Sequence, residues 1–123
     1  MKGSNCFYEI EREGDTLRVD LVGEMDHHNA VTLRTQLDAL IMEERPRKMV
    51  IDLSGIGFMD SSGLGFVMGR YALVQKFGGE LVLASPNERI MKIFELAGLS
   101  RIIKIEDRKK EEIQGGKAEL KIR

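Results

Sequence analysis

Two adjacent serines follow an aspartate at residues 60–62, and they are the side chains of this chain best placed for chemistry. A β-branched apolar run over residues 48–53 precedes them, and apolar residues recur at helical spacing from Leu64 to Val74. The serines are therefore predicted to begin a helix. The first N–H groups of a helix lack partners and the helix dipole is positive there, so a hydroxyl caps well and a phosphate is stabilised. Ser61 and Ser62 are thus candidates for a structural cap and for a phosphorylation site.

A serine hydrolase is one alternative. The G-x-S-x-G elbow is missing because Met59 stands two positions before Ser61, and the only two histidines are adjacent, at positions 27 and 28. A catalytic triad would have to take its base from that pair. Gly63 and Gly65 lack the lysine and the spacing of a phosphate-binding P-loop. A small hydrolase that uses Ser61, or a metal at Asp26-His27-His28, is the less favoured alternative, and no catalytic residues are predicted.

A second polar segment, Gly23–His28, carries Glu24, Asp26 and two histidines between a predicted strand and a predicted helix. An Asp-His-His triplet could belong to a metal site, yet such sites need further ligands and the chain has no third histidine. We expect Asp26 or His28 to lie near the helix cap instead, and we predict no metal and no cofactor. If this segment lies beside the serines, Glu24, Asp26 and Asp60 form an acidic patch that suits a basic partner surface.

The elements that position these segments follow from hydrophobic periodicity. The predicted order is strand, strand, helix, strand, helix, strand, helix, strand, over residues 7–13, 16–23, 29–45, 48–53, 61–77, 80–84, 86–97 and 102–105. The segment Ser85-Pro86-Asn87-Glu88 predicts a capping box with Ser85 as the cap and Pro86 as the first helical residue. Strands separated by helices imply right-handed crossovers, so the predicted class is α/β, with a mixed sheet whose antiparallel part is the first hairpin.

Length and composition indicate one small domain. The 123 residues suffice for a single core at about 7–105, and residues 106–123 are expected to form a charged C-terminal helix and tail. A net charge of −1 gives no general attraction to nucleic acid or to a membrane. The single cysteine, Cys6, permits no internal disulfide, and no apolar run approaches the ~18 residues of a membrane helix. We therefore expect a cytoplasmic protein that binds neither nucleic acid nor membrane.

With these residues in view, the chain resembles the STAS family over roughly residues 7–105. The motifs that carry the resemblance occur in the family's order: GEMDHH at 23–28, FMDSSGLG at 58–65, GRY at 69–71, and then the GGE, FELAGL and II-K-I sequences. The resemblance implies a mostly parallel sheet with the hairpin at one edge and helices mainly on one face. Met25 stands where leucine is common, which conserves volume, and the charged tail matches no family pattern.

The resemblance also implies a function. In this family the serine that follows the aspartate of the D-S-S-G-L-G motif is phosphorylated by a partner that is both an anti-sigma factor and a serine kinase. We therefore expect a regulatory protein and not an enzyme. Its unphosphorylated form binds the kinase and releases a sporulation sigma factor, phosphorylation of Ser61 inactivates it, and a serine phosphatase removes the phosphate. A stress-response pathway is the alternative. The expected partner-binding residues are Glu24, Asp26, Asp60, Ser61, Ser62, Gly63, Gly65 and Arg70.

Overall fold

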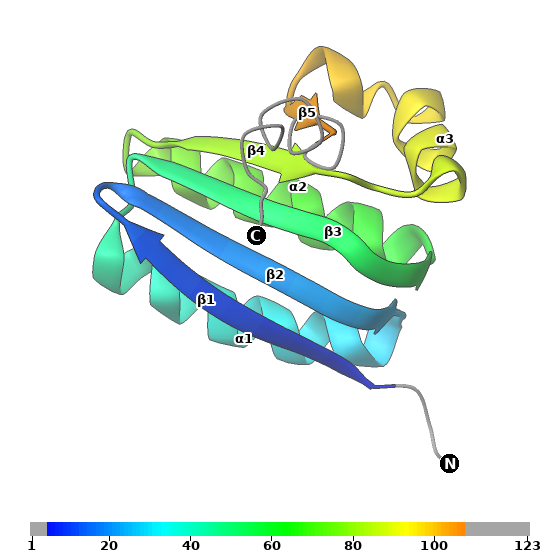
Figure 1. Cartoon of the computed structure of the whole chain (residues 1–123), viewed down its shortest axis with the longest axis horizontal. Helices are drawn as coiled ribbons and strands as arrows, with labels where there is room; N and C mark the ends of the chain where they lie inside the picture. The colour runs from blue at the N-terminus through cyan, green and yellow to red at the C-terminus, as the bar shows by residue number, and fades with distance from the viewer. Residues whose placement is uncertain (1–4, 108–123) are drawn as a thin grey trace, which may run out of the picture.

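The computed structural model describes residues 5–107 and contains five strands, three α-helices and one 3-10 helix. Their bounds are β1 Cys6–Glu13, β2 Thr16–Met25, α1 His27–Glu44, β3 Lys48–Met59, α2 Ser61–Lys76, β4 Glu80–Ala84, α3 Glu88–Leu96, η1 Leu99–Arg101 and β5 Lys104–Glu106. The strands lie in one sheet in the order β1-β2-β3-β4-β5 (Figure 1). β1 pairs antiparallel with β2, and every later pair is parallel. The predicted α/β class with a mixed sheet is confirmed.

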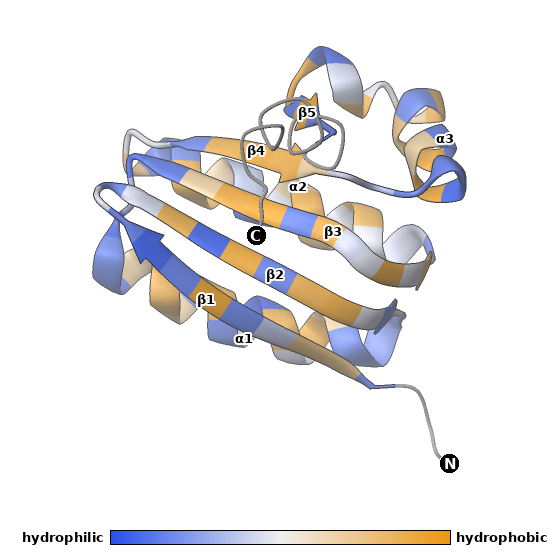
Figure 2. Cartoon of the chain, viewed as in Figure 1, coloured by the Kyte–Doolittle hydropathy of each residue, from blue (hydrophilic) through white to orange (hydrophobic). Residues whose placement is uncertain are grey.

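The main core lies between the sheet and the two long helices. α1 and α2 lie behind the same face of the sheet (Figure 1). Apolar and polar residues alternate along β2 (Figure 2), as expected for a strand with only one face in the core. Leu21, Ile51 and Leu83 are at most 1% exposed, and Leu37 and Ile41 of α1 are fully buried against them. Each such side chain contributes roughly 1.5–3 kcal/mol of burial, which fixes the helices on this face.

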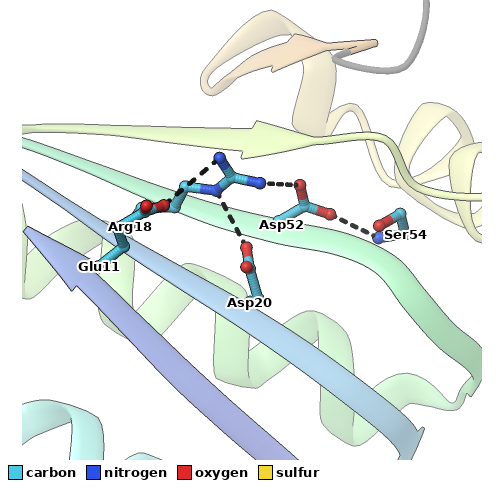
Figure 3. A network of polar contacts seen from close by, with 5 residues as sticks. All are labelled: Glu11, Arg18, Asp20, Asp52 and Ser54. Carbon is cyan, nitrogen blue, oxygen red and sulfur yellow. Dashed lines mark hydrogen bonds and ion pairs between the residues drawn. The ribbon is translucent and has the colours of Figure 1, made fainter. Parts of the chain in front are cut away.

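The opposite face of the sheet carries a polar network at its centre (Figure 3). The guanidinium of Arg18 lies 3.0 Å from a carboxylate oxygen of Asp20, 3.3 Å from Asp52 and 3.8 Å from Glu11. Asp52 also accepts the N–H of Ser54 at 2.9 Å. Because Asp52 is only 6% exposed, these partners offset the cost of burying its charge. The network joins β1, β2 and β3 across the sheet.

β3 is longer than predicted, since it continues from Leu53 to Met59. The glycines and the serine after Leu53 have little strand propensity, and the sequence pattern ends there. Pairing with β2 extends the strand, because the register runs on to Met25 and Met59. Gly55 permits this close pairing: an added Cβ would lie 2.7 Å from the carbonyl oxygen of Leu21. The extension determines where the next helix begins.

The predicted capping box at Ser85 is wrong. The N-cap of α3 is Asn87, whose side chain accepts the N–H of Ile90 at 2.8 Å, and the helix begins at Glu88. Asn is as good a cap as Ser, so the sequence offers two competing starts. Ser85 takes a left-handed conformation, with φ 54°, and its N–H donates to the carbonyl of Glu106. Ser85 therefore lies in the loop between β4 and α3, where its N–H continues the pairing of β4 with β5.

The last strand also differs from its prediction. η1 occupies part of the expected connection, and β5 begins at Lys104 instead of residue 102. Glu106, which the sequence assigned to the tail, is the last residue of β5. The predicted charged helix from about residue 107 and the tail to residue 123 lie outside the described residues. Within residues 5–107, no helix is long and apolar enough to cross a membrane.

Candidate functional site

The two polar segments singled out in the sequence meet at the carboxyl-terminal ends of β2 and β3. β2 and β3 are parallel, so their carboxyl ends lie together, with Met25 opposite Met59. The N–H of Asp60 donates to the carbonyl of Met25 at 3.2 Å, which ties the two strand ends to each other. α1 begins directly after β2, and α2 directly after β3. The structure thus places the starts of two helices, and the residues around them, side by side.

An aspartate caps each of these helices. Asp26 accepts the N–H of Asn29 at 2.9 Å, and Asp60 accepts the N–H of Ser62 at 2.8 Å. The side-chain amide of Asn29 also donates to the carbonyl of Glu24 at 2.8 Å, which holds the end of β2 against α1. A cap of this kind contributes about 1 kcal/mol. The cap of α2 is therefore the aspartate, and neither serine is needed for that purpose.

The two serines have different surroundings. Ser61 is the first residue of α2 and is exposed. Among the described residues, no hydrogen bond holds its hydroxyl. Ser62 is half-buried, and its Oγ lies 3.4 Å from Nδ1 of His27 at the start of α1. The Ser61 hydroxyl is accordingly the one that a second protein can reach without disturbing an internal contact.

Gly63 and Gly65 contribute to the site in different ways. Gly63 is buried over the methionines at the two strand ends: an added Cβ would lie 2.2 Å from Cγ of Met59 and 2.9 Å from Cγ of Met25. Only a glycine lets α2 start this close to the sheet. Gly65 is exposed, and an added Cβ would meet nothing within 4 Å. Gly63 therefore lies between α2 and the sheet, whereas Gly65 faces solvent.

The structure does not place Arg70 with the other predicted site residues. Arg70 is 5% exposed and lies between α2 and α1, where its Nε is 2.7 Å from a carboxylate oxygen of Asp38. Its guanidinium also lies over the ring of Phe66 and donates to the carbonyl of that residue at 3.3 Å. Burial lowers the pKa of Arg70, and the charge of Asp38 opposes this effect. These contacts join the two helices to each other.

Two residues near the site were not predicted from the sequence. His27 contacts Ser62, whereas the sequence suggested it only as a metal ligand or a triad base. Phe58 is 45% exposed beside the start of α2. Neighbouring residues of a strand point to opposite faces, so the exposure of Phe58 follows from the burial of Met59. The predicted strand ended at residue 53, and for that reason this signal was missed. Within the part of the chain that the structure describes, no group of three or more His, Cys, Asp or Glu side chains is arranged to hold a metal ion.

The carboxylates of the two segments give the site negative charge. The segments 23–28 and 58–65 contain three acidic residues and neither lysine nor arginine. The field of Asp26 extends to β1: burial, with a smaller contribution from the Asp26 carboxylate, raises the pKa of the Cys6 thiol to about 11. The site therefore presents an exposed hydroxyl on a helix start within an acidic surface, which is suited to contact with a basic protein surface.

This arrangement of a mixed five-stranded sheet and two adjacent capped helix starts defines a small α/β interaction domain. The chain belongs to the STAS domain family, whose model matches residues 8–112. The expected resemblance to this family is thereby confirmed.

Individual relatives agree with this assignment. The anti-sigma F factor antagonist of Paenibacillus polymyxa is 37% identical over 103 residues, which is 84% of this chain and 88% of the relative. The anti-sigma-B factor antagonist of Bacillus subtilis (strain 168) is 34% identical over 101 residues, or 82% and 91% of the two chains. Among solved structures, the unphosphorylated form of the anti-sigma factor antagonist SpoIIAA matches with a TM-score of 0.73 and 25% identity, over 94% of this chain and 100% of that one. The phosphorylated form of Bacillus SpoIIAA, also 25% identical, matches with a TM-score of 0.67, over 88% and 98%.

Proposed function

We propose that this protein is an anti-sigma factor antagonist that phosphorylation of Ser61 inactivates. In its unphosphorylated form it binds an anti-sigma factor that is also a serine kinase, and the bound sigma factor is released. Relatives named as antagonists support this role over more than four fifths of the chain. The observation that carries the switch is the exposed hydroxyl of Ser61 at the start of α2, held by no hydrogen bond among the described residues.

The docking surface we propose is built around the two helix starts. Glu24 and Asp26 from the end of β2 and Asp60 beside Ser61 supply negative charge, and the exposed ring of Phe58 supplies apolar area. Such a surface favours a partner with basic residues around an apolar pocket. Ser62 and the glycines at 63 and 65 complete the proposed surface, whereas Arg70 acts from behind it by holding α2 against α1.

The class of sigma factor that the pathway controls is also a proposal. The Asp-His-His and Gly-Arg-Tyr segments favour a sporulation sigma factor, in line with the relative that antagonises an anti-sigma F factor. The anti-sigma-B relative supports a stress-response sigma factor as the second candidate. Binding of this protein to purified anti-sigma factors of the two classes distinguishes them, since only the cognate factor should form a complex at micromolar concentrations.

The modification is a phosphoryl transfer whose catalytic groups belong to the kinase. Oγ of Ser61 attacks the γ-phosphorus of ATP, the bond to the β–γ bridging oxygen breaks, ADP leaves, and the hydroxyl proton passes to a base of the kinase. This chain supplies an exposed nucleophile on a rigid helix start. A serine phosphatase, the second proposed partner, hydrolyses the phosphoserine and restores the unmodified form.

The proposed effect of the phosphate is electrostatic. It adds about −1.5 to −2 charges beside Asp60 and Asp26. Repulsion and desolvation of ~3 kcal/mol at the interface would weaken binding about a hundredfold, because ~1.4 kcal/mol corresponds to a factor of ten. The dipole of α2 offsets this by roughly 0.3–1 kcal/mol and stabilises the modified helix start. The domain therefore stays folded while its affinity for the partner falls.

Incubation with the anti-sigma kinase and ATP, followed by intact-mass measurement and peptide mapping, tests the proposal. The unmodified protein should gain one phosphate, on Ser61. Ser61→Ala should bind the kinase normally and gain none, and Ser61→Asp should bind about tenfold to a hundredfold more weakly. Ser62→Ala is the matched control and should still be phosphorylated on Ser61. Equal affinities of Ser61→Ala and Ser61→Asp for the kinase would contradict the charge mechanism.

A further inference from the structure

A groove runs along the outer edge of the sheet, and Ser61 is not among the residues that line it. β1 is an edge strand, with β2 on one side and no described strand on the other. The N–H and C=O groups of every second residue of β1 therefore point away from the sheet. β1 passes over α1 (Figure 1), and the groove of about 390 Å³ between them is lined by Cys6 and Tyr8 from β1 and by His28, Thr32 and Gln36 from α1.

The side chains of β1 divide into two sets. Those on the core side are half-buried and mostly apolar, and they are Cys6, Tyr8 and Ile10. Those on the other side are exposed and mostly acidic, and they are Phe7, Glu9, Glu11 and Glu13. The only basic residue of β1 is Arg12, and its Nε donates to Glu44 at the end of α1 at 2.8 Å, so its charge is already engaged. Glu11 is 3.8 Å from Arg18, whereas Glu9 and Glu13 form no ion pair with another described residue. The edge is acidic on one side, and on the other it carries half-buried β1 side chains beside the polar side chains of Thr32 and Gln36.

A strand added to this edge would meet both sets in alternation. Side chains of neighbouring strands lie on the same faces of the pleated sheet, and successive residues change face. One set of residues of the added strand would lie beside Glu9 and Glu11, and the next set would enter the groove over Tyr8 and Thr32. The complementary strand therefore alternates basic residues with uncharged ones.

We propose that the groove between β1 and α1 binds an extended segment of a protein partner in which basic and uncharged residues alternate, and that this segment pairs with β1 as a sixth strand. A second copy of β1 is a poorer occupant, because its glutamates would face Glu9 and Glu11, and like charges directly opposite each other are destabilising. The groove reaches His28 and Asn29 in the first turn of α1, so it ends next to Asp26. A partner could occupy both places, yet the groove needs neither Ser61 nor its modification.

The test uses a peptide of eight alternating lysines and valines, with eight alternating glutamates and valines as the control. Binding is followed by two-dimensional NMR of the ¹⁵N-labelled full chain. The basic peptide should shift the amide signals of β1 and of the first two turns of α1 and leave those of α3 unchanged. The acidic peptide should bind at least tenfold more weakly. The double variant Glu9→Lys, Glu11→Lys should reverse this preference.

Two tryptophan variants locate the binding site. Thr32→Trp adds a large side chain to the lining of the groove and should weaken binding of the basic peptide about tenfold or more. Thr35→Trp, also exposed on α1 but outside the groove, should leave the affinity unchanged. Circular dichroism spectra that match the unmodified chain show that both variants are folded.

Several results would overturn the inference. These are signals of β1 that do not respond to the basic peptide, equal affinities for the two peptides, and undiminished binding by a folded Thr32→Trp variant. Shifts of the β1 signals with protein concentration alone would identify a second copy as the occupant instead. None of these peptide experiments involves phosphorylation of Ser61. The proposed function is tested separately, and it fails if the kinase adds no phosphate to Ser61.

Discussion

Replacing Gly63 and Gly65 by alanine, one at a time, tests how closely α2 must approach the sheet at the site. At Gly63 the new Cβ would lie 2.2 Å from Cγ and 2.8 Å from Sδ of Met59, and 2.9 Å from Cγ of Met25. Met59 is 3% exposed and Met25 is fully buried, so neither side chain can move into solvent. At Gly65, two residues further along the same helix, the new Cβ would have no neighbour within 4 Å. The two variants thus differ in packing and share the same change in chemistry.

The expected magnitudes follow from two opposing effects. Glycine within a helix is less favourable than alanine by roughly 0.5–1 kcal/mol, so Gly65→Ala should raise the free energy of unfolding by about that amount. Gly63→Ala has the same gain, but forcing a methyl group into the packed layer costs about 1–3 kcal/mol. Because the helix propensity cancels between the variants, Gly63→Ala should be less stable than Gly65→Ala by about 1–3 kcal/mol.

Equilibrium urea denaturation followed by circular dichroism measures both free energies. The slope with denaturant should be unchanged, so that the midpoints report stability directly. Equal stability of the two variants, or greater stability of Gly63→Ala, would refute the close packing of α2 on the methionine pair. If Gly65→Ala also binds the proposed kinase partner more weakly while being more stable, the exposed glycine belongs to the docking surface.

Four further tests concern the cap of α2, the buried ion pair of Arg70 and the pKa of Cys6. Asp60→Ala should lower the free energy of unfolding by about 1 kcal/mol and Asp60→Asn by much less, because Asn retains the cap; urea denaturation checks this, and equal losses would contradict it. Asp38→Ala leaves the guanidinium of Arg70 buried without its carboxylate. The free energy of unfolding should fall by about 1–3 kcal/mol, a value discounted for the partial exposure of Asp38. In thermal unfolding, the double variant Asp38→Ala, Arg70→Met should recover part of the lost stability. Cys6 should react slowly with iodoacetamide near neutral pH, because its raised pKa keeps the thiol protonated, and the rate should keep rising towards pH 11. A rate that is half-maximal near pH 8.5, about the ordinary thiol pKa, would contradict the burial of this residue. Asp26→Asn should lower that pKa slightly, since the carboxylate is the smaller of the two causes.

Local sequence signals predicted most of the elements correctly, and their failures have identifiable causes. The alternation before Gly23 and the helical spacing after Leu64 determine the hairpin and α2 without reference to the rest of the chain. The prediction failed at Ser85, because Asn87 is an equally good cap. The hydrogen bond from the N–H of Ser85 to Glu106 of β5 decided between them. It stopped early in β3, where Gly55 and its neighbours lack strand propensity and pairing with β2 continues the strand.

Some features of the candidate site likewise follow from local sequence, and others depend on tertiary contacts. Ser61 at the start of a helix, and the acidic character of both segments, follow from residue types and spacing alone, because caps and periodicity are properties of neighbouring residues. Adjacent placement of Asp26 and Asp60, burial of Arg70 against Asp38, and exposure of Phe58 depend on the parallel register of β2 with β3 and on the packing of α1 against α2. Contacts between residues more than thirty positions apart arise only when the sheet has formed, and for that reason the tertiary structure alone decides which of the predicted residues share a surface.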